Sequence, residues 1–420
     1  MPKRLSPDWP PRSSEADMDA QAKTFPTPIV RESLSDRIRP HLAAIAKRAA
    51  ATEAARTVPA ENIELIRQAG FVRALLPAAL GGDERDLWDY CDGVRTLASA
   101  CPSTGWVTGV LNVHQAALPH YDVSVQKEIL ATGPDTIICS SGSPAIKAKL
   151  ADGGIIVSGK GRWSSGCDHA EWAVVGVKVP DTSDSQYPQR NYRDHLFMAH
   201  RSEYVIDDTW YSTGMRGSGS KDLVFKDLFV PFRRMERMDA VMFNYSHGAG
   251  TVDSWISRVP FPLLFGVFLP AIALGCADGM VREFTTRQRS RKNAYTGAQG
   301  ILNPAGYMRL AESVHELESL SVYYRHLLEV MQRHGEQGER LTEAKFLEMQ
   351  TKFPFITTRA GQVLDRLFLG AGSSAIADFN PMQRFWRDGH TARLHTGSDY
   401  DQSLQHHGRS LLGLAPTPDL

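Results

Sequence analysis

The chain has 420 residues, of which 47 are Lys or Arg and 47 are Asp or Glu, so its formal net charge at pH 7 is zero. This balance argues against nucleic acid and anionic membranes as partners, because both attract proteins with a surplus of basic residues. The five cysteines are scattered and have no Cys-x-x-Cys spacing, which argues against a disulfide framework and a zinc site and indicates a reducing compartment. The sequence has no run as long as a membrane span and no signal-peptide pattern, so we expect a cytoplasmic protein.

The first half of the chain changes from helical to extended patterns. Residues 1–28 are rich in Pro, Ser, Asp and Lys and are predicted to be a disordered tail. An N-terminal helical domain over 29–135 is predicted to contain helices at 59–69, 87–99 and 103–118. Between 136 and 245, short β-branched runs bounded by turn residues predict a small antiparallel β-domain, with strands near 136–139, 154–158, 172–177 and 223–225 and an exposed loop at 181–194.

The helical pattern returns after Pro262 and continues to the end of the chain. Apolar residues every three or four positions over 310–328 describe one long amphipathic helix. Further helices are expected at 265–291, 342–370 and 382–412, which would make 246–420 a C-terminal four-helix bundle. The fold class is therefore α+β, with helical, β and helical domains in that order.

A turn of small and hydroxyl-bearing residues, Gly370-Ala-Gly-Ser-Ser-Ala375, precedes the segment that carries His395. Backbone N–H groups at a helix start favour anions, and small residues permit a close approach. An imidazole titrates near neutral pH. This arrangement favours a phosphate-bearing cofactor and an acid/base group in one site.

Several motifs, taken in their order and spacing, resemble the acyl-CoA dehydrogenase fold over about residues 30–413. They are Gly70-Phe71-Val72 with Leu76-Pro77 and Gly81-Gly82, the segment 161–167, Thr209-Trp210 with 214–220, and Phe229-Val230-Pro231. True acyl-CoA dehydrogenases remove an α-proton with a glutamate. Here the segment before the last predicted helix has no carboxylate until Asp378, which disfavours dehydrogenation.

Within that fold, the chain more closely resembles the oxygenase components of two-component aromatic hydroxylases, on segments 101–106, 163–167 and 387–413. The resemblance implies reduced FMN or FAD, O₂, and transfer of one oxygen atom from a flavin C4a-hydroperoxide to a small phenolic or other aromatic substrate. Because the chain has no strand–GxGxxG–helix unit, a separate NAD(P)H:flavin reductase would supply the reduced flavin. A homotetramer is also implied. The alternatives are N- or S-oxygenation in the same fold and acyl-CoA dehydrogenation.

The same resemblance assigns residues to the flavin. Ser165, in the turn that begins at Trp163, resembles the hydroxyl that faces flavin N5, and Trp106 resembles the aromatic residue beside the isoalloxazine. A serine bonded within its own turn and an indole packed in the core are the plainer explanations. For the phosphate, Arg287 and the turn residues fit an anion clamp, although a basic helix stripe is often only a solvated face. The turn residues are Gly372, Ser373 and Ser374.

Two histidines and a serine are candidates for substrate chemistry. His395 is predicted to be the base that takes the phenol proton, unless it is a surface histidine. His114 and Ser140 resemble the positions that hold the substrate oxygen. His114 also suits a core position, and Ser141 is an equal alternative to Ser140. His390 and His395 are five residues apart and do not share a helix face, so no metal site is predicted. Aromatic residues proposed for the pocket are Phe243, Tyr245, Trp255, Phe261 and Phe265.

Overall fold

The structure is a computed structural model that describes residues 31–181, 192–244, 246, 248, 250–292, 296–338 and 341–414. The predicted tail over 1–28 lies outside the described residues, as does most of the predicted loop at 181–194. Contacts join Ser33–Leu420 in one unit, so the finer domain boundaries given above stay a prediction.

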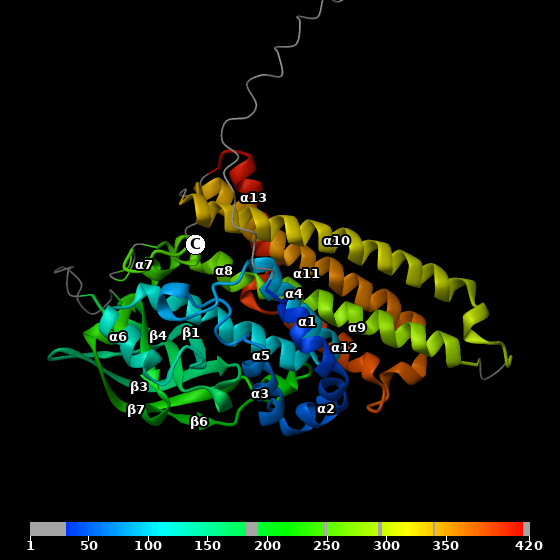
Figure 1. The fold of residues 1–420 in the computed structure, drawn as a ribbon, viewed down its shortest axis with the longest axis horizontal. Coiled ribbons are helices and arrows are strands. Elements are labelled where there is room, and N and C mark those ends of the chain that lie inside the picture. The colour runs from blue at the N-terminus through cyan, green and yellow to red at the C-terminus, as the bar shows by residue number, and fades with distance from the viewer. Residues whose placement is uncertain are drawn as a thin grey trace, which may run out of the picture. The chain divides into compact units, whose positions relative to one another are not determined.

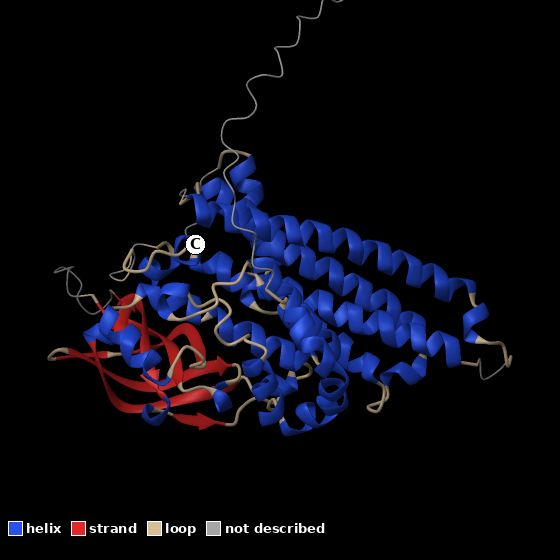
Figure 2. Cartoon of the chain, viewed as in Figure 1, coloured by secondary structure: helices blue, strands red, loops and turns tan. Residues whose placement is uncertain are grey.

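The N-terminal part is helical, as expected (Figures 1 and 2). Its helices are α1 (Leu34–Ile38), α2 (Leu42–Ala55), α3 (Ala60–Gln68), α4 (Leu87–Ala100), α5 (Pro102–Val113) and α6 (Val123–Ile129). The helix predicted at 103–118 ends early and continues as a 3₁₀ helix, η4, over Gln115–His120. Pro119 lies inside η4 and has no N–H to donate to the carbonyl oxygen of Gln115, so the α-helix cannot continue through it.

Two four-stranded sheets form the central part, with strand orders β1-β4-β5-β8 and β2-β3-β7-β6. The strands are β1 (Ile138–Lys147), β2 (Lys149–Ala151), β3 (Gly154–Ser164), β4 (Trp172–Pro180), β5 (Tyr192–His200), β6 (Val205–Asp207), β7 (Lys221–Pro231) and β8 (Met235–Arg237). The pair β1–β4 is parallel, in contrast to the all-antiparallel prediction. The chain between them passes through β2 and β3 of the other sheet, and such a crossover permits parallel pairing.

The C-terminal part returns to helices, and the long ones lie side by side (Figure 1). They are α7 (Met238–Met242), α8 (Phe261–Gly266), α9 (Phe268–Ser290), α10 (Pro304–Gln337), α11 (Glu343–Ala371), α12 (Pro381–Arg393) and α13 (Tyr400–Leu411). The single helix predicted at 382–412 is wrong, because α12 stops at Arg393 and α13 starts at Tyr400. His395 lies in the break and caps a short 3₁₀ helix, η13 (Thr396–Ser398), instead of standing on a helix.

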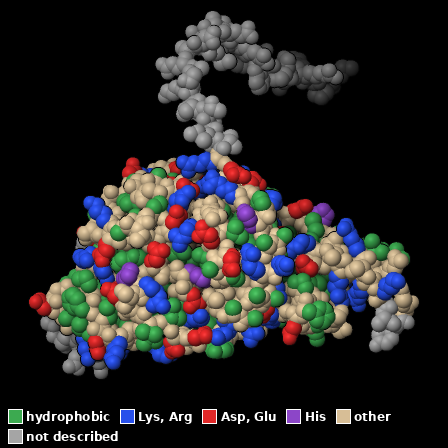
Figure 3. Space-filling view, turned by 60° about the horizontal axis from the view of Figure 1, so that its bottom comes forward, with side chains coloured by type: hydrophobic (Ala, Val, Ile, Leu, Met, Phe, Trp, Pro, Cys, Tyr) green, Lys and Arg blue, Asp and Glu red, His purple; other side chains and the backbone are tan. Residues whose placement is uncertain are grey.

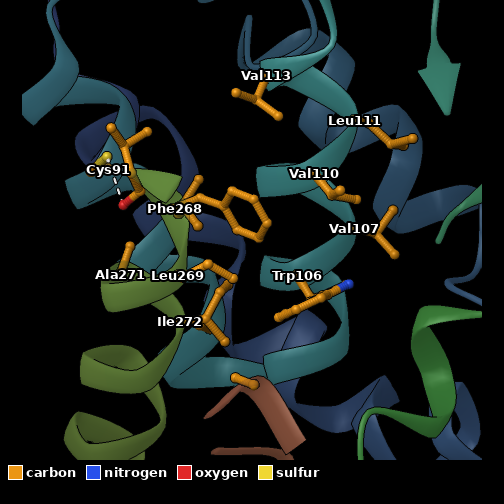
Figure 4. Packing of buried hydrophobic residues seen from close by; sticks show 14 of the residues in the cluster. Cys91, Trp106, Val107, Val110, Leu111, Val113, Phe268, Leu269, Ala271 and Ile272 are labelled. Atoms are coloured by element: carbon orange, nitrogen blue, oxygen red, sulfur yellow. Dashed lines mark hydrogen bonds between the residues drawn. The ribbon is translucent and has the colours of Figure 1, made fainter. Parts of the chain in front are cut away.

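Helix α9 is the centre of the packing. Every residue from Phe268 to Ala277 is buried, as expected for a helix that is apolar all round. The stretch Phe261–Ser290 has the length and composition of a membrane span, but 83% of its most apolar window is buried inside the structure. The Phe268 ring points from α9 to α5, between Val110 and Trp106 (Figure 4). Gly109 makes room for it, since a Cβ there would lie 2.7 Å from the ring.

Charged side chains are distributed over the surface. On the face drawn in Figure 3, Lys and Arg side chains alternate with Asp and Glu side chains. This distribution is consistent with the formal net charge of zero.

Close approach of α9 to α4 depends on Gly275. A Cβ at Gly275 would lie 2.5 Å from the Arg95 carbonyl oxygen and 2.6 Å from the Ala98 Cβ. Replacing Gly275 by Ala is expected to lower the free energy of unfolding by about 1–3 kcal/mol, because a rigid helix pair cannot absorb the extra methyl group. Thermal melting would measure this loss.

Gly408→Ala in α13 is the matched control, since a Cβ there would meet no atom within 4 Å. Its melting temperature is expected to stay equal or rise, because Ala favours the helix. Equal melting temperatures for Gly275→Ala and the unmodified protein would contradict the tight α4–α9 contact.

Candidate active site

The end of β3 and the turn after it hold two of the predicted flavin residues, Trp163 and Ser165. Trp163 has φ of +62°, which is rare for a residue with a side chain, and its indole is 65% exposed. Ser165 is buried beside it, and its Oγ bonds other elements instead of its own turn. It accepts from Trp106 Nε1 at 3.0 Å and pairs with Ser220 Oγ at 2.6 Å. The turn therefore joins Trp106, Ser165 and Trp163 in one place.

His395 approaches this group from the break between α12 and α13. Its ring centroid lies 5.7 Å from that of Trp106 and 5.5 Å from that of Phe265. Its Nδ1 accepts the backbone N–H of Gly397 at 3.0 Å, so in the neutral ring the proton resides on Nε2. Burial lowers the pKa of His395 to about 4, which favours this neutral form. His395 is thus a hydrogen-bond donor at Nε2.

His114 has the opposite arrangement. Its Nδ1 lies 3.0 Å from the carbonyl oxygen of Ile138, and a carbonyl only accepts, so Nδ1 carries the proton. Nε2 is then an acceptor, and it is buried with no hydrogen-bond partner among the described residues. Burial lowers the pKa of His114 to about 4, although the Ile138 carbonyl opposes the shift. The Phe265 ring lies 5.9 Å from this imidazole, so Phe265 stands between the two histidines.

The two candidate serines of β1 face in opposite directions, because side chains alternate along a strand. Ser141 is buried and donates to the carbonyl oxygen of Arg162 in β3 at 2.8 Å. Ser140 shares its face with Ile138, which packs in a cluster that includes Phe261 and Phe265. Of the two hydroxyls, that of Ser140 is on the face toward the His114 side.

The predicted phosphate residues also come together, but at the other end of α9. Arg287 donates from Nε to the carbonyl oxygen of Ala371 at 3.0 Å and from Nη2 to Ser374 Oγ. Arg291 bonds the same carbonyl at 2.9 Å, and burial and this neighbouring charge lower the pKa of Arg287. Gly372 has φ of +79°, and Ser373 beside it is exposed.

One chain therefore holds the predicted site residues as two groups. Arg287 is nineteen residues after Phe268 in α9, and a rise of 1.5 Å per residue separates them by about 28 Å. Ser374 and His395 likewise lie before and after α12. The sequence motif brought the turn and the histidine close in the chain, but α12 holds them apart.

Of the aromatic residues proposed for the pocket, Phe265 and Phe261 lie here, with ring centroids 6.1 Å apart. Phe243 instead packs on Phe346, and the Trp255 carbonyl faces Gly335 of α10. Tyr245 lies outside the described residues. Sequence reasoning missed two contributors: Phe268 and Ser220. The repeated serines of the 217–220 segment were a signal for the second, but that segment predicted only a turn.

Comparisons with known proteins identify the family of the chain. Residues 267–400 match the family described as acyl-CoA dehydrogenase, C-terminal domain. The oxygenase component of p-hydroxyphenylacetate 3-hydroxylase from Acinetobacter baumannii is 34% identical over 390 residues, covering 92% of this chain and 91% of that protein. The crystal structure of the HsaA monooxygenase from Mycobacterium tuberculosis has a TM-score of 0.83 at 31% identity, covering 92% of this chain and 98% of that one. The chain belongs to the flavin-dependent monooxygenases, as an oxygenase component.

A further relative of this oxygenase is the oxygenase component of the FADH₂-dependent resorcinol hydroxylase from Rhizobium sp., 29% identical over 385 residues, covering 87% of this chain and 90% of that protein. The family membership agrees with the monooxygenase prediction and sets the dehydrogenase alternative aside. The site also fits a flavin on its own geometry. A turn that holds an exposed indole in a strained backbone, next to a buried hydroxyl, suits a planar ring with polar edges.

The lowered pKa of His114 makes the stability of this oxygenase sensitive to acid. The folded pKa of about 4 lies below the unfolded value of 6.5, so the unfolded state binds the proton more readily in that interval. The stabilisation is complete above pH 6.5 and is lost as the pH falls toward 4. Between these values we expect the unmodified protein to lose about 3 kcal/mol more than His114→Asn.

Urea denaturation at a series of pH values would measure the difference. Replacing His315 by Asn is the control, because that side chain is 81% exposed. If His114→Asn and the unmodified protein lost stability in parallel, His114 would not be the buried neutral group described here.

Proposed function

We propose that this oxygenase hydroxylates a small phenolic substrate whose hydroxyl group binds between His114 and Ser140. The observation that carries the proposal is the His114 Nε2 acceptor, which is buried and has no hydrogen-bond partner in the part of the chain that the structure describes. An unpaired buried acceptor costs about 1–3 kcal/mol, and a phenol hydroxyl is a donor that would satisfy it. When bound, reduced flavin would supply the two electrons that activate O₂, and O₂ would supply the oxygen atom that is transferred. The relatives named for hydroxyphenylacetate and resorcinol act on phenols, which supports the same class of substrate here.

His114 and His395 would have different roles, because their ring nitrogens carry the proton at different positions. The Ile138 carbonyl holds Nδ1–H of His114, so Nε2 points its lone pair at the substrate hydroxyl. The hydrogen bond from the substrate hydroxyl to His114 Nε2 would increase electron density on the aromatic ring of the substrate, which makes the ring carbon that accepts the oxygen atom a better nucleophile. With a pKa of about 4, His114 stays neutral, so it would orient the phenol as an acceptor and would not hold the transferred proton.

His395 would have a complementary part. It was predicted to be the base, and that role requires Nδ1 to release the Gly397 N–H, because Nε2 already carries the proton. We propose that in the resting site His395 donates from Nε2 into the pocket. Around both histidines, Phe265, Phe268 and Trp106 form an aromatic wall that excludes water, which strengthens polar interactions inside.

Replacing His114 by Ala is expected to reduce hydroxylated product from p-hydroxyphenylacetate or resorcinol by about tenfold or more, because leaving the buried phenol hydroxyl without its acceptor costs about 1–3 kcal/mol. Oxygen consumption with reduced flavin should continue and yield hydrogen peroxide instead. Ser140→Ala should act in the same direction. Product is measured by chromatography and peroxide with catalase.

Ser141→Ala is the matched control, because its hydroxyl is engaged with Arg162 on the opposite face of β1. It should retain coupling of oxygen use to product. If the unmodified protein oxidised amines or sulfides and His114→Ala did so equally well, the phenol proposal would be wrong and N- or S-oxygenation would replace it.

The cluster at the far end of α9 leads us to propose a homotetramer in which one chain binds the flavin phosphate of a neighbouring chain. Arg287 and Arg291 converge on an exposed turn that carries the hydroxyl groups of Ser373 and Ser374, and such a group of donors is suited to an anion. Exposed apolar side chains surround this turn and are suited to a subunit contact: Leu302 70%, Met308 66%, Leu369 79%, Ile376 69% and Phe379 86% exposed. The proposal also includes reduced FMN or FAD as the cofactor and a separate reductase that supplies it. We propose a cytoplasmic location as well, because all five cysteines are free.

Arg287→Gln is expected to weaken binding of reduced FMN about tenfold or more, since a charged hydrogen bond to phosphate is lost. Binding of reduced riboflavin, which has no phosphate, should not change. Anaerobic titration measures both affinities. Arg289→Gln is the charge-matched control on the same helix, because Arg289 is exposed. Equal weakening of riboflavin and FMN binding would exclude a phosphate role for Arg287.

A further inference from the structure

A buried acid, Asp388, connects α12 to a strained loop beside the flavin turn. Its side chain is 2% exposed, and its Oδ1 accepts the backbone N–H of Met215 at 2.6 Å. Met215 has φ of +51°, a left-handed backbone that a residue with a side chain rarely adopts, and it begins the 3₁₀ helix η8 (Arg216–Ser218). Such a conformation persists only where surrounding contacts determine it, and the carboxyl of Asp388 is one of them.

A line of hydrogen-bonded hydroxyl groups, those of Ser218, Ser220 and Ser165, connects this loop to the site. Ser218 Oγ donates to the Met215 carbonyl oxygen at 2.7 Å and lies 2.8 Å from Ser220 Oγ. Ser220 Oγ lies 2.6 Å from Ser165 Oγ, which accepts from Trp106 Nε1 at 3.0 Å. Ser218 and Ser220 are almost fully buried, so no solvent replaces these bonds. The direction in which Ser165 presents its hydroxyl therefore depends on the Met215 loop.

We propose that Asp388 is a positioning residue, which holds the Met215 loop so that Ser218 and Ser220 orient the Ser165 hydroxyl toward the flavin. The inference rests on the proposed flavin role of Ser165. Asp388 itself touches neither substrate nor flavin in this assignment, and it acts through the four hydroxyl and backbone contacts of the line.

The charge of Asp388 supports a functional role over a purely structural one. Burial raises its pKa to about 7, while the Met215 N–H and two arginines oppose the shift. Because the folded pKa lies above the unfolded value, the stabilisation is complete at low pH and is lost as the pH rises toward 7. The charged and titratable groups around it come from α2, α12, α9 and the residue before α5: Glu53, Arg384, Arg387, Cys276 and Cys101. A buried acid that costs stability at neutral pH is typical of functional sites.

The test is a double-mutant cycle on binding of reduced FMN, measured by anaerobic titration of the full chain. Asp388→Ala and Ser165→Ala are each expected to raise the dissociation constant about tenfold. The dissociation constant of the double variant should be no more than about twofold above that of the single variant that binds FMN less tightly. The reason is that both changes interrupt the same series of hydrogen bonds. Asp388→Asn keeps an Oδ1 acceptor for Met215, so it should bind FMN within about threefold of the unmodified protein and melt at a higher temperature at pH 8.

Additive effects in the cycle, or normal binding by Asp388→Ala beside weakened Ser165→Ala, would overturn this inference and leave the flavin site intact. Normal binding by Ser165→Ala would remove the proposed flavin role of Ser165, and this inference with it. If Asp388→Ala does not fold, Ser218→Ala breaks the same line without touching Asp388 and takes its place in the cycle. Cys276→Ala is the control, since Cys276 packs against Gly389 of α12 and should leave FMN binding unchanged.

Discussion

Complete burial of α9 is the constraint on which the rest of the structure depends. The helix is apolar on all sides from Phe268 to Ala277, and the free energy of removing that surface from water requires neighbours all round it. Glycines set how near those neighbours come, with Gly275 against α4 and Gly109 against the Phe268 ring. Trp106 lies on α5 about one turn before Gly109, and its indole packs against the Phe268 ring. The position of the indole in the site therefore follows from core packing (Figure 4).

Backbone partners determine which ring nitrogen carries the proton in the two buried histidines. The two histidines have the same side chain and the same lowered pKa of about 4, yet one presents an acceptor and the other a donor. The difference comes from single backbone partners, the Ile138 carbonyl for His114 and the Gly397 N–H for His395. Low dielectric surroundings make such fixed protonation states expensive to change, so each imidazole is pre-set for one role.

Two structural connections link the candidate site to distant elements. A helix of 23 residues carries aromatic packing at one end and the arginine pair at the other, so α9 ties two groups that no single pocket of one chain contains. The hydroxyl line from Met215 to Ser165 works over shorter range, and it lets a carboxyl on α12 influence a turn at the end of β3. In both proposals, function depends on elements whose side chains lie outside the pocket.

Local pattern in the sequence was sufficient for much of the fold. The apolar periodicity of α4 and the β-branched runs of β3 and β4 are short-range features, so the helical, β and helical arrangement could be predicted from them. The order of the glycine and tryptophan motifs indicated the family. The family resemblance also named most residues of the candidate site, and their roles stay proposals. The parallel β1–β4 pair, the break after α12, the choice of Ser140 over Ser141 and the tautomers of the histidines could not be predicted, because each depends on a partner distant in the chain. Sequence alone therefore determined which chemical groups this protein carries, and tertiary structure decided which of them meet and in which protonation state, since backbone partners and burial exist only in the folded chain.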